Sequence, residues 1–223
     1  MIKIDNFYSG KIPEEGLVWF ASLNKNLSDI ATTGVTESGH VMDALPSGWS
    51  FTEHENIPCL YLDGHNDGRW TSTDSTNMPM QINERTISFW VKIIRGTSEN
   101  NGGRNDYPYK YNQCGIIGYG IHNSYSTGNF YDVVIDTVSA QYCTKGRIAI
   151  HSYSYGAGDF YAKKETDWFS KWCHVAITNF FSGSSVRSNF YLNGEFVESY
   201  SWDEGKTGGC PTSFNRLSIG NKN

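Results

Sequence analysis

The sequence is poor in clustered basic residues and in long apolar runs. It contains 18 Lys and Arg against 23 Asp and Glu, which gives a formal net charge of −5. Proteins that bind nucleic acids neutralise phosphates with clustered Lys and Arg, so this composition argues against a nucleic-acid ligand. No apolar run approaches the roughly 20 residues that a membrane-spanning helix needs. We therefore expect neither a nucleic acid nor a membrane as a partner.

Cysteine is also scarce, and its spacing excludes the common zinc motifs. The five cysteines are an odd number, so they cannot all pair within one chain, and none lies in a CxxC motif. Cys59 and Cys173 lie in apolar, strand-like runs, and we predict that both are reduced and buried. The first residues, MIKIDNFYSG, lack the charged-then-apolar pattern of a signal peptide. This pattern favours synthesis in the cytoplasm, with later display on a surface such as that of a virion.

Helical periodicity is nearly absent, whereas alternation with a period of two recurs along the chain. In TISFWVKII (86–94), Ile87, Phe89 and Val91 fall on one face of a strand. The pair Asn193-Gly194 separates two short apolar runs, and this dipeptide favours a type I′ hairpin turn. Roughly ten such strands, with turn residues between them, predict an all-β sandwich of two antiparallel sheets.

Five segments in this order resemble those of laminin-G-like domains, in the superfamily of concanavalin A-like lectins and glucanases. The segments are GLVWFASLNKNLSD (16–29), LYLDGHNDGRW (60–70), RTISFWVKI (85–93), WCHVAITNFFSG with NFYLNGEFV (172–197), and RLSIGN (216–221). The resemblance implies a jelly-roll β-sandwich over residues 16–223, preceded by an N-terminal arm or lead-in strand over residues 1–15.

The same resemblance raises the question of an open sheet edge. Members of the family usually have a further strand after the last of these segments, beside the first strand, which is Leu17–Leu23 here. We expect that edge to be filled by the arm Met1–Ile4 or by a strand exchanged with an assembly partner, because exposed edges are normally paired or blunted. A locally shortened sheet is the alternative.

Motifs that carry catalysis are missing as well. Sandwich glucanases place two carboxylates across a cleft, usually from a Glu-x-Asp-x-(x)-Glu run on one strand, and no such run occurs in this chain. Asp132 and Asp136 are four residues apart, so they share one face of a strand, with Val134 between them. There is no Gly-x-Ser-x-Gly elbow and no His-Glu-x-x-His motif. We therefore expect no catalytic residues and a protein that is not an enzyme, with a β-glucan hydrolase as an alternative.

One turn has the composition of a calcium site. DGHNDG (63–68) brings together Asp63, Asn66 and Asp67, whose side-chain oxygens are ligands that calcium prefers. The same residue types are also common in turns that bind no metal. Calcium at these three residues is the only cofactor that the sequence suggests.

Two segments with similar composition suggest a ligand-binding surface. HNSYSTGNFYD (122–132) and HSYSYGAGDFYAK (151–163) are both rich in Tyr, Ser, Gly and Asn or Asp, the mixture used by adaptable binding loops. Sugars are bound by ring faces that stack and by Asn or Asp side chains that hydrogen-bond hydroxyl groups. The candidate ligand-binding residues are Tyr125, Asn129, Tyr131, Tyr153, Tyr155 and Asp159. Ordinary turn residues, with Tyr at the sheet edges, are the alternative.

These observations together predict a non-catalytic recognition or adhesion module that binds a glycan or a protein surface. A phage virion component, such as a tail-fibre or capsid-decoration protein, fits the expected route from cytoplasm to surface. This part of the prediction rests on analogy between folds. The alternative is a purely structural virion or assembly subunit that has no glycan ligand.

Overall fold

The computed structural model describes residues 2–3, 42–62, 70–71, 84–92, 111–120, 130–138, 147–153, 159–161, 171–182, 185–203 and 217–220. In these residues every regular element is a strand. No helix occurs in them, and so none that could cross a membrane.

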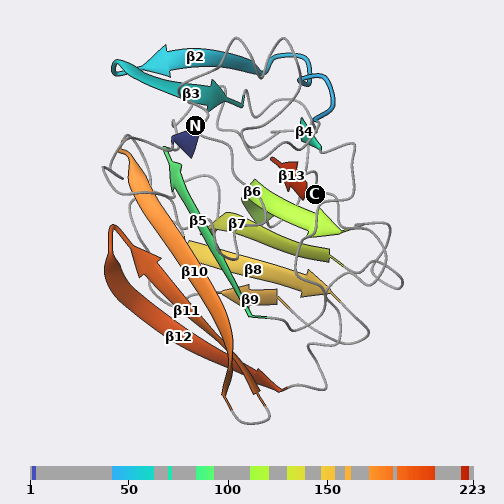
Figure 1. Cartoon of the computed structure of the whole chain (residues 1–223), viewed down its shortest axis with the longest axis vertical. Helices are drawn as coiled ribbons and strands as arrows, with labels where there is room; N and C mark the ends of the chain where they lie inside the picture. The colour runs from blue at the N-terminus through green and yellow to red at the C-terminus, as the bar shows by residue number, and fades with distance from the viewer. Residues whose placement is uncertain are drawn as a thin grey trace.

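The strands form two antiparallel sheets, which we call the β10 sheet and the β7 sheet. The β10 sheet has the order β12 (Glu195–Asp203), β11 (Ser185–Leu192), β10 (Cys173–Ser182), β5 (Arg85–Val91), β1 (Ile2–Lys3), β3 (Ile57–Tyr61) and β2 (Ser50–His54). The β7 sheet has the order β4 (Trp70–Thr71), β13 (Leu217–Ile219), β6 (Tyr111–Gly120), β7 (Phe130–Val138), β8 (Arg147–Tyr153) and β9 (Asp159–Tyr161). Figure 1 shows β5 and β10–β12 in one layer and β6–β9 in the other. This confirms the predicted all-β jelly-roll sandwich.

The core lies between the two sheets, and the predicted alternation in β5 accounts for its centre. Ile87, Phe89 and Val91 are buried, while the residues between them are exposed or half-exposed. The neighbouring strand β10 follows the same rule, because Val175 is aligned with Phe89 and is fully buried. Core residues from the facing β7 sheet are Trp70, Ile116, Val133 and Ile219.

Trp70 connects the two sheets at the edge of the core. Its side chain is 1% exposed, although β4 is a short edge strand. The indole packs edge-on against Phe51 of β2, with ring centroids 5.8 Å apart, and its Nε1 donates to the Asp43 carbonyl at 2.8 Å. The hydrogen bond satisfies the polar atom of a buried ring, which would otherwise cost free energy.

Two tight turns join neighbouring strands of the β10 sheet. At the β11–β12 turn, Asn193 and Gly194 have φ values of 52° and 84°, as the predicted type I′ hairpin turn requires. At the β2–β3 turn, Glu55 and Asn56 also have positive φ values, 56° and 61°. The second turn has no glycine, so the sequence pattern did not reveal it. It places the Glu55 side chain at the tip of a hairpin.

Within the predicted N-terminal arm the structure describes Ile2–Lys3, which form strand β1 of the β10 sheet. Ile2 is aligned with Leu60 of β3 on one side and with Val91 of β5 on the other, and Lys3 is aligned with Trp90. Strand β1 therefore lies inside the sheet, between strands that come much later in the sequence. The predicted first strand, Leu17–Leu23, lies outside the described residues, and strand exchange with a partner stays a prediction.

Both cysteines that were predicted to be buried thiols are confirmed as such. Cys59 and Cys173 form no disulfide, and neither has any solvent exposure. Burial raises the pKa of the Cys59 thiol, so it stays protonated and unreactive at neutral pH.

Candidate functional site

Three of the predicted ligand-binding residues lie at the same end of the β7 sheet. Tyr131 lies at the start of β7, Tyr153 at the end of β8, and Asp159 at the start of β9. Because these strands are antiparallel neighbours, the three positions fall at the same end of the sheet. The other predicted residues, Tyr125, Asn129 and Tyr155, lie outside the described residues.

The strand register divides these three residues between the two faces of the sheet. Phe130 is aligned with Tyr153, and Asp132 is aligned with His151. His151 is in turn aligned with Asp159, so Tyr153 and Asp159 share one face with Phe130, Asp132 and His151. Tyr131 is aligned with Ser152 and belongs to the opposite face.

The face that carries Asp132 is the outward one. Val133, the next residue in β7, is 1% exposed and belongs to the core between the sheets. Successive residues of a strand belong to opposite faces, so Asp132 lies on the face turned away from the core. Tyr131 shares the core-side face with Val133.

A row of polar and small residues runs across this outward face. Its members, in register from one edge of the sheet to the other, are Thr71, Ser218, Gly118, Asp132, His151 and Asp159. Neighbouring strands are about 4.8 Å apart, so the backbones of Asp132 and Asp159 are separated by about 9.6 Å. We call the part formed by Asp132, His151 and Asp159 the Asp-His-Asp row.

Aromatic residues flank the Asp-His-Asp row on both sides. One adjacent row aligns Gly120, Phe130 and Tyr153, and the other aligns Val134, Ala149 and Tyr161. Beside Asp132 and Phe130, the neighbouring strand β6 has Gly118 and Gly120, and Gly118 is buried. Acidic, histidine and aromatic residues therefore occupy neighbouring register positions on β7, β8 and β9.

The row that contains Asp132 also crosses β13 at Ser218, and this end of the row is shielded from solvent. Ser218 is only 7% exposed, and its hydroxyl group donates to the Gly118 carbonyl at 3.3 Å. A ligand on this face is therefore expected over β7, β8 and β9 and not over β13.

The three predicted calcium ligands, Asp63, Asn66 and Asp67, lie outside the residues that the structure describes. Among the side chains that the structure does describe, no group of three His, Cys, Asp or Glu could hold a metal ion. Calcium binding at the 63–68 turn stays a prediction.

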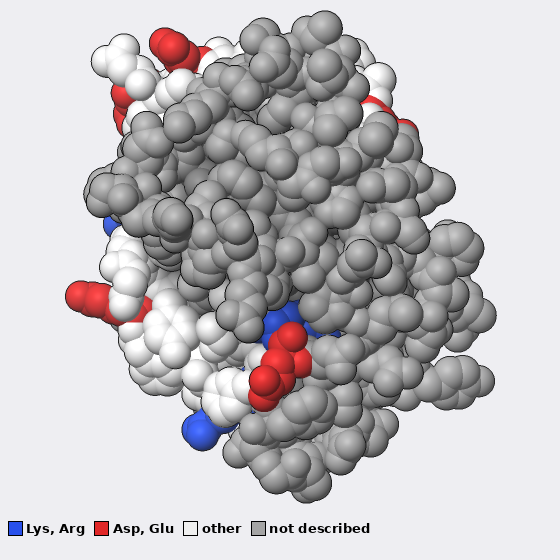
Figure 2. Space-filling view, in the orientation of Figure 1, with Lys and Arg blue, Asp and Glu red and all other residues white. Residues whose placement is uncertain are grey.

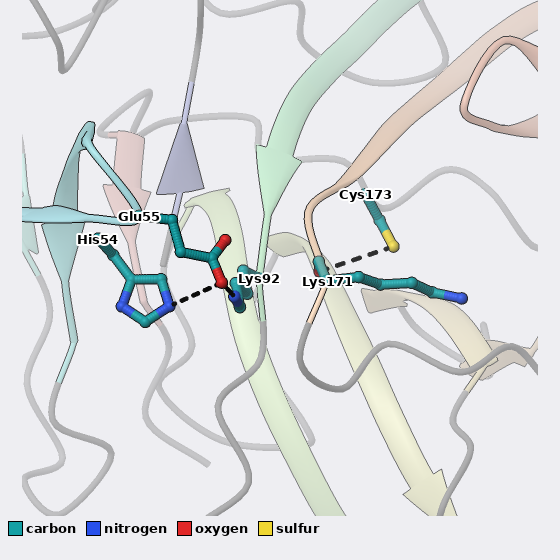
Figure 3. A network of polar contacts seen from close by, with 5 residues as sticks. All are labelled: His54, Glu55, Lys92, Lys171 and Cys173. Atoms are coloured by element: carbon teal, nitrogen blue, oxygen red, sulfur yellow. Dashed lines mark hydrogen bonds and ion pairs between the residues drawn. The ribbon is translucent and has the colours of Figure 1, made fainter.

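A second titratable cluster lies where β5 ends, against the tip of the β2–β3 hairpin (Figure 3). Lys92 is 3% exposed, and its Nζ lies 2.5 Å from Oε1 of Glu55. The same carboxylate oxygen is 3.7 Å from Nε2 of His54, so Glu55 lies between the two basic groups. The nearby Cys173 thiol makes a separate contact, 4.0 Å from the Lys171 carbonyl. This cluster has a single carboxylate and connects a turn to the sheet, so we assign it to stability and not to chemistry.

Acidification is expected to weaken the contact between the β2–β3 turn and β5. The hydrogen bond from Lys92 holds the pKa of the Glu55 carboxyl below its ordinary value of 4.5. A carboxylate with a lowered folded-state pKa stabilises the fold above its unfolded-state pKa, and this contribution is lost as the pH falls through the folded-state pKa. Below about pH 4.5, the Tm of the wild type should therefore fall more steeply than that of Glu55→Gln. Because Glu55 is 56% exposed, solvent screening keeps the effect modest. Identical Tm profiles for both proteins, from thermal melts across the acidic range, would contradict this assignment.

Comparisons with known proteins found a similar solved structure but no match by sequence. No family model matches the chain, and no curated protein matches it. Among solved structures, it is similar to an endo-1,3-beta-glucanase from Streptomyces sioyaensis, with 12% identity and a TM-score of 0.44. The match covers 77% of this chain and 62% of the glucanase, so the chain spans less than two thirds of that enzyme. The described strands show an all-β sandwich of two antiparallel sheets; the concanavalin A-like superfamily and its laminin-G-like subgroup stay predictions.

This comparison corrects one expectation from the sequence. The absence of a Glu-x-Asp-x-(x)-Glu run predicted a protein that is not an enzyme, but the similar solved structure is an enzyme of this fold. The expectation is therefore wrong and is withdrawn. That expectation was based on a search for a motif within one strand, and such a search cannot find carboxylates that come from different strands. The register of β7, β8 and β9 brings Asp132 and Asp159 into one row from different strands.

Proposed function

We propose that this protein binds a carbohydrate chain on the outward face of the β7 sheet, over the Asp-His-Asp row. The observation that carries the proposal is the register that aligns Asp132, His151 and Asp159 between rows containing Phe130, Tyr153 and Tyr161. Carboxylates accept hydrogen bonds from sugar hydroxyl groups, and aromatic residues offer apolar area for the faces of sugar rings. A few polar groups among aromatic ones is the usual composition of a small-molecule site.

Hydrolysis of a glycosidic bond is the second candidate, and the two aspartates of the row favour it. Glycoside hydrolysis uses one carboxylic acid to protonate the leaving oxygen and a second carboxylate to activate water or to attack the sugar. The carboxyl groups of inverting enzymes are roughly 6.5–9.5 Å apart. The backbones of Asp132 and Asp159 are two strand spacings apart, about 9.6 Å, at aligned positions on one face of the sheet. In this reading, one aspartate is the acid and the other is the base.

Two measurements on the same variants test both candidates. Equilibrium binding to soluble β-1,3-glucan and to a panel of other neutral polysaccharides should show at least one ligand. Asp132→Asn and Asp159→Asn should each weaken that binding by about tenfold or more, since each removes a charged acceptor for hydrogen bonds from sugar hydroxyl groups. Asp136→Asn is the matched control, because it is on the same strand but outside the row, and it should bind like the wild type. If neither aspartate of the row affects binding, the proposed site is wrong.

The release of reducing ends from the same polysaccharides separates the two candidates. A hydrolase should lose about 10²–10⁴-fold in rate when either aspartate is changed to Asn, the usual contribution of a general acid or base. Binding without any release of reducing ends would support recognition alone. Adhesion and display on a virion, which would be the biological setting of such recognition, stay predictions.

A further inference from the structure

The β2–β3 hairpin, residues 50–61, is joined to the longer strands of the β10 sheet through one short strand. Strand β1 has 2 residues and lies between β3 and β5, whereas β5 and β10 have 7 and 10 residues. Ile2 is aligned with Leu60 on the side of the hairpin and with Val91 on the side of β5. Figure 1 shows the hairpin at one end of the molecule, with β1 between it and β5. Among the described strands, β1 is therefore the only one that pairs with both the hairpin and β5.

A side-chain contact also connects the hairpin directly to the end of β5 (Figure 3). Lys92 follows β5, and its Nζ donates to Oε1 of Glu55 at the tip of the hairpin, at 2.5 Å. Lys92 is 3% exposed, and a buried ammonium group is costly unless it has a polar partner. The contact therefore favours the arrangement in which the hairpin tip lies against β5. We call this contact the latch.

The backbone at the hairpin tip is strained, and the latch acts on one of the strained residues. Glu55 and Asn56 have φ values of 56° and 61°, in the left-handed region that residues other than glycine rarely adopt. Such conformations persist where the surrounding contacts hold them. The hydrogen bond from Lys92 to Glu55 is one such contact. Loss of the latch therefore weakens both the turn and its attachment to β5.

Aromatic contacts hold the hairpin on its other side. Phe51 of β2 packs against Trp70 of β4, with ring centroids 5.8 Å apart. Nε1 of Trp70 donates to the Asp43 carbonyl at 2.8 Å, and β4 pairs with β13 in the β7 sheet. These contacts attach the hairpin to the β7 sheet and do not involve β5. The hairpin can therefore separate from β5 and keep its contact with Trp70.

The outer side of the hairpin lies at the surface of the molecule. Figure 2 shows described acidic and uncharged side chains at the surface, at the end of the molecule where β2 and β3 lie. Glu53, Glu55 and Asn56 are exposed. Strand β2 is the last strand on its side of the sheet, so no described strand pairs with the hairpin beyond it.

We infer that the β2–β3 hairpin is a flap that opens away from β5 while β5, β10, β11 and β12 stay paired, and that the latch keeps it closed. Units that open below the free energy of global unfolding often coincide with supersecondary motifs such as a hairpin. In the open state, β1 has an unpaired edge, and such an edge can pair with a strand of another chain. The flap belongs to the β10 sheet, so its opening does not depend on the proposed carbohydrate site of the β7 sheet.

Two buried thiols report the opening, because they lie on opposite sides of β1. Cys59 is in β3 of the flap and Cys173 is in β10, and neither has solvent exposure or a disulfide. An alkylating reagent reaches a buried thiol only when the structure around it opens. Opening of the flap moves Cys59 away from β1, whereas exposure of Cys173 requires β10 to leave β5.

The test is the rate of alkylation by iodoacetamide in the full chain without denaturant, with mass spectrometry of peptides to separate the two thiols. Each rate is divided by the rate of the same thiol in the denatured chain, which removes differences in intrinsic reactivity. Cys59 should be alkylated at least about tenfold faster than Cys173, because the flap opens without global unfolding. Lys92→Met removes the donor of the latch and should raise the Cys59 rate by about a further tenfold, as expected for a lost hydrogen bond to a charged group. The Cys173 rate should not change.

Arg187→Met is the matched control, since it removes the 2.6 Å hydrogen bond from Nε of Arg187 to Ser199 in the same sheet, away from the flap. It should leave both rates unchanged. Glu55→Ala removes the latch at its 56% exposed side chain, so it provides the same test if Lys92→Met does not fold. Equal rates for the two thiols, or latch variants that raise both rates alike, would show that the sheet opens only as a whole and would overturn the flap. A Cys59 rate that neither latch variant changes would overturn the role of the latch.

Discussion

Val175→Asp is expected to leave little or no folded protein. Val175 has no solvent exposure and lies in the centre of the β10 sheet, aligned with Phe89 on one side and Leu192 on the other. A carboxylate at this position would be buried among apolar side chains, at a cost of several kcal/mol or more. Domains of this kind are stable by only about 5–15 kcal/mol, so one such change can remove most of the stability. Circular dichroism and soluble yield would show the loss.

The matched control for this prediction is Thr178→Asp, on the same strand. Thr178 belongs to the outward face and is half-exposed, so its replacement by Asp should fold and melt within a few degrees of the wild type. The contrast depends on the strand register alone, because a shift of one residue exchanges the two faces. A well-folded Val175→Asp with an unchanged Tm would show that the described register of β10 is wrong.

Trp70→Ala is expected to destabilise the fold by about 3–5 kcal/mol, the usual cost of removing a large buried ring. The indole is 1% exposed and packs on Phe51 of the opposite sheet, so its loss leaves a cavity at the junction of the two sheets. The Asp43 carbonyl also loses its donor. Urea denaturation, followed by circular dichroism, gives the change in free energy of unfolding.

Trp70→Phe separates packing from hydrogen bonding at the same position. Phenylalanine keeps a ring against Phe51 but has no N–H group. The free energy of unfolding should therefore fall less than in Trp70→Ala, but by more than the roughly 1 kcal/mol of a typical hydrogen bond. Equal destabilisation by the two variants would mean that the ring contact contributes little. A cost below about 1 kcal/mol for Trp70→Ala would contradict its role in joining the sheets.

The sequence pattern was sufficient for the strands whose faces differ most in polarity. The alternation of TISFWVKII gave the buried residues of β5, and Asn193-Gly194 gave the β11–β12 turn. The β2–β3 turn was missed because Glu55 and Asn56 have positive φ values without a glycine. The place of Ile2 between Leu60 and Val91 was not predicted, because pairing over such sequence distances has no local signal.

The candidate site was only partly accessible from the sequence for the same reason. Composition singled out Tyr153 and Asp159, and the same two segments also contain Asp132 and His151. What joins these residues is the register of β7, β8 and β9, which depends on pairing and on irregularities such as the bulge between Gly115 and Ile117. The contact between the Trp90 and His174 rings was not predicted, because both residues match strand positions that a sandwich needs for packing alone.

The position of β1 has a consequence for the order in which the protein forms during translation. Ile2 leaves the ribosome well before its two neighbours in the sheet, Leu60 and Val91. Contacts between distant parts of a chain form slowly, and unpaired strands on a nascent chain are prone to aggregate. Until β5 emerges, β1 therefore lacks one of its two neighbouring strands.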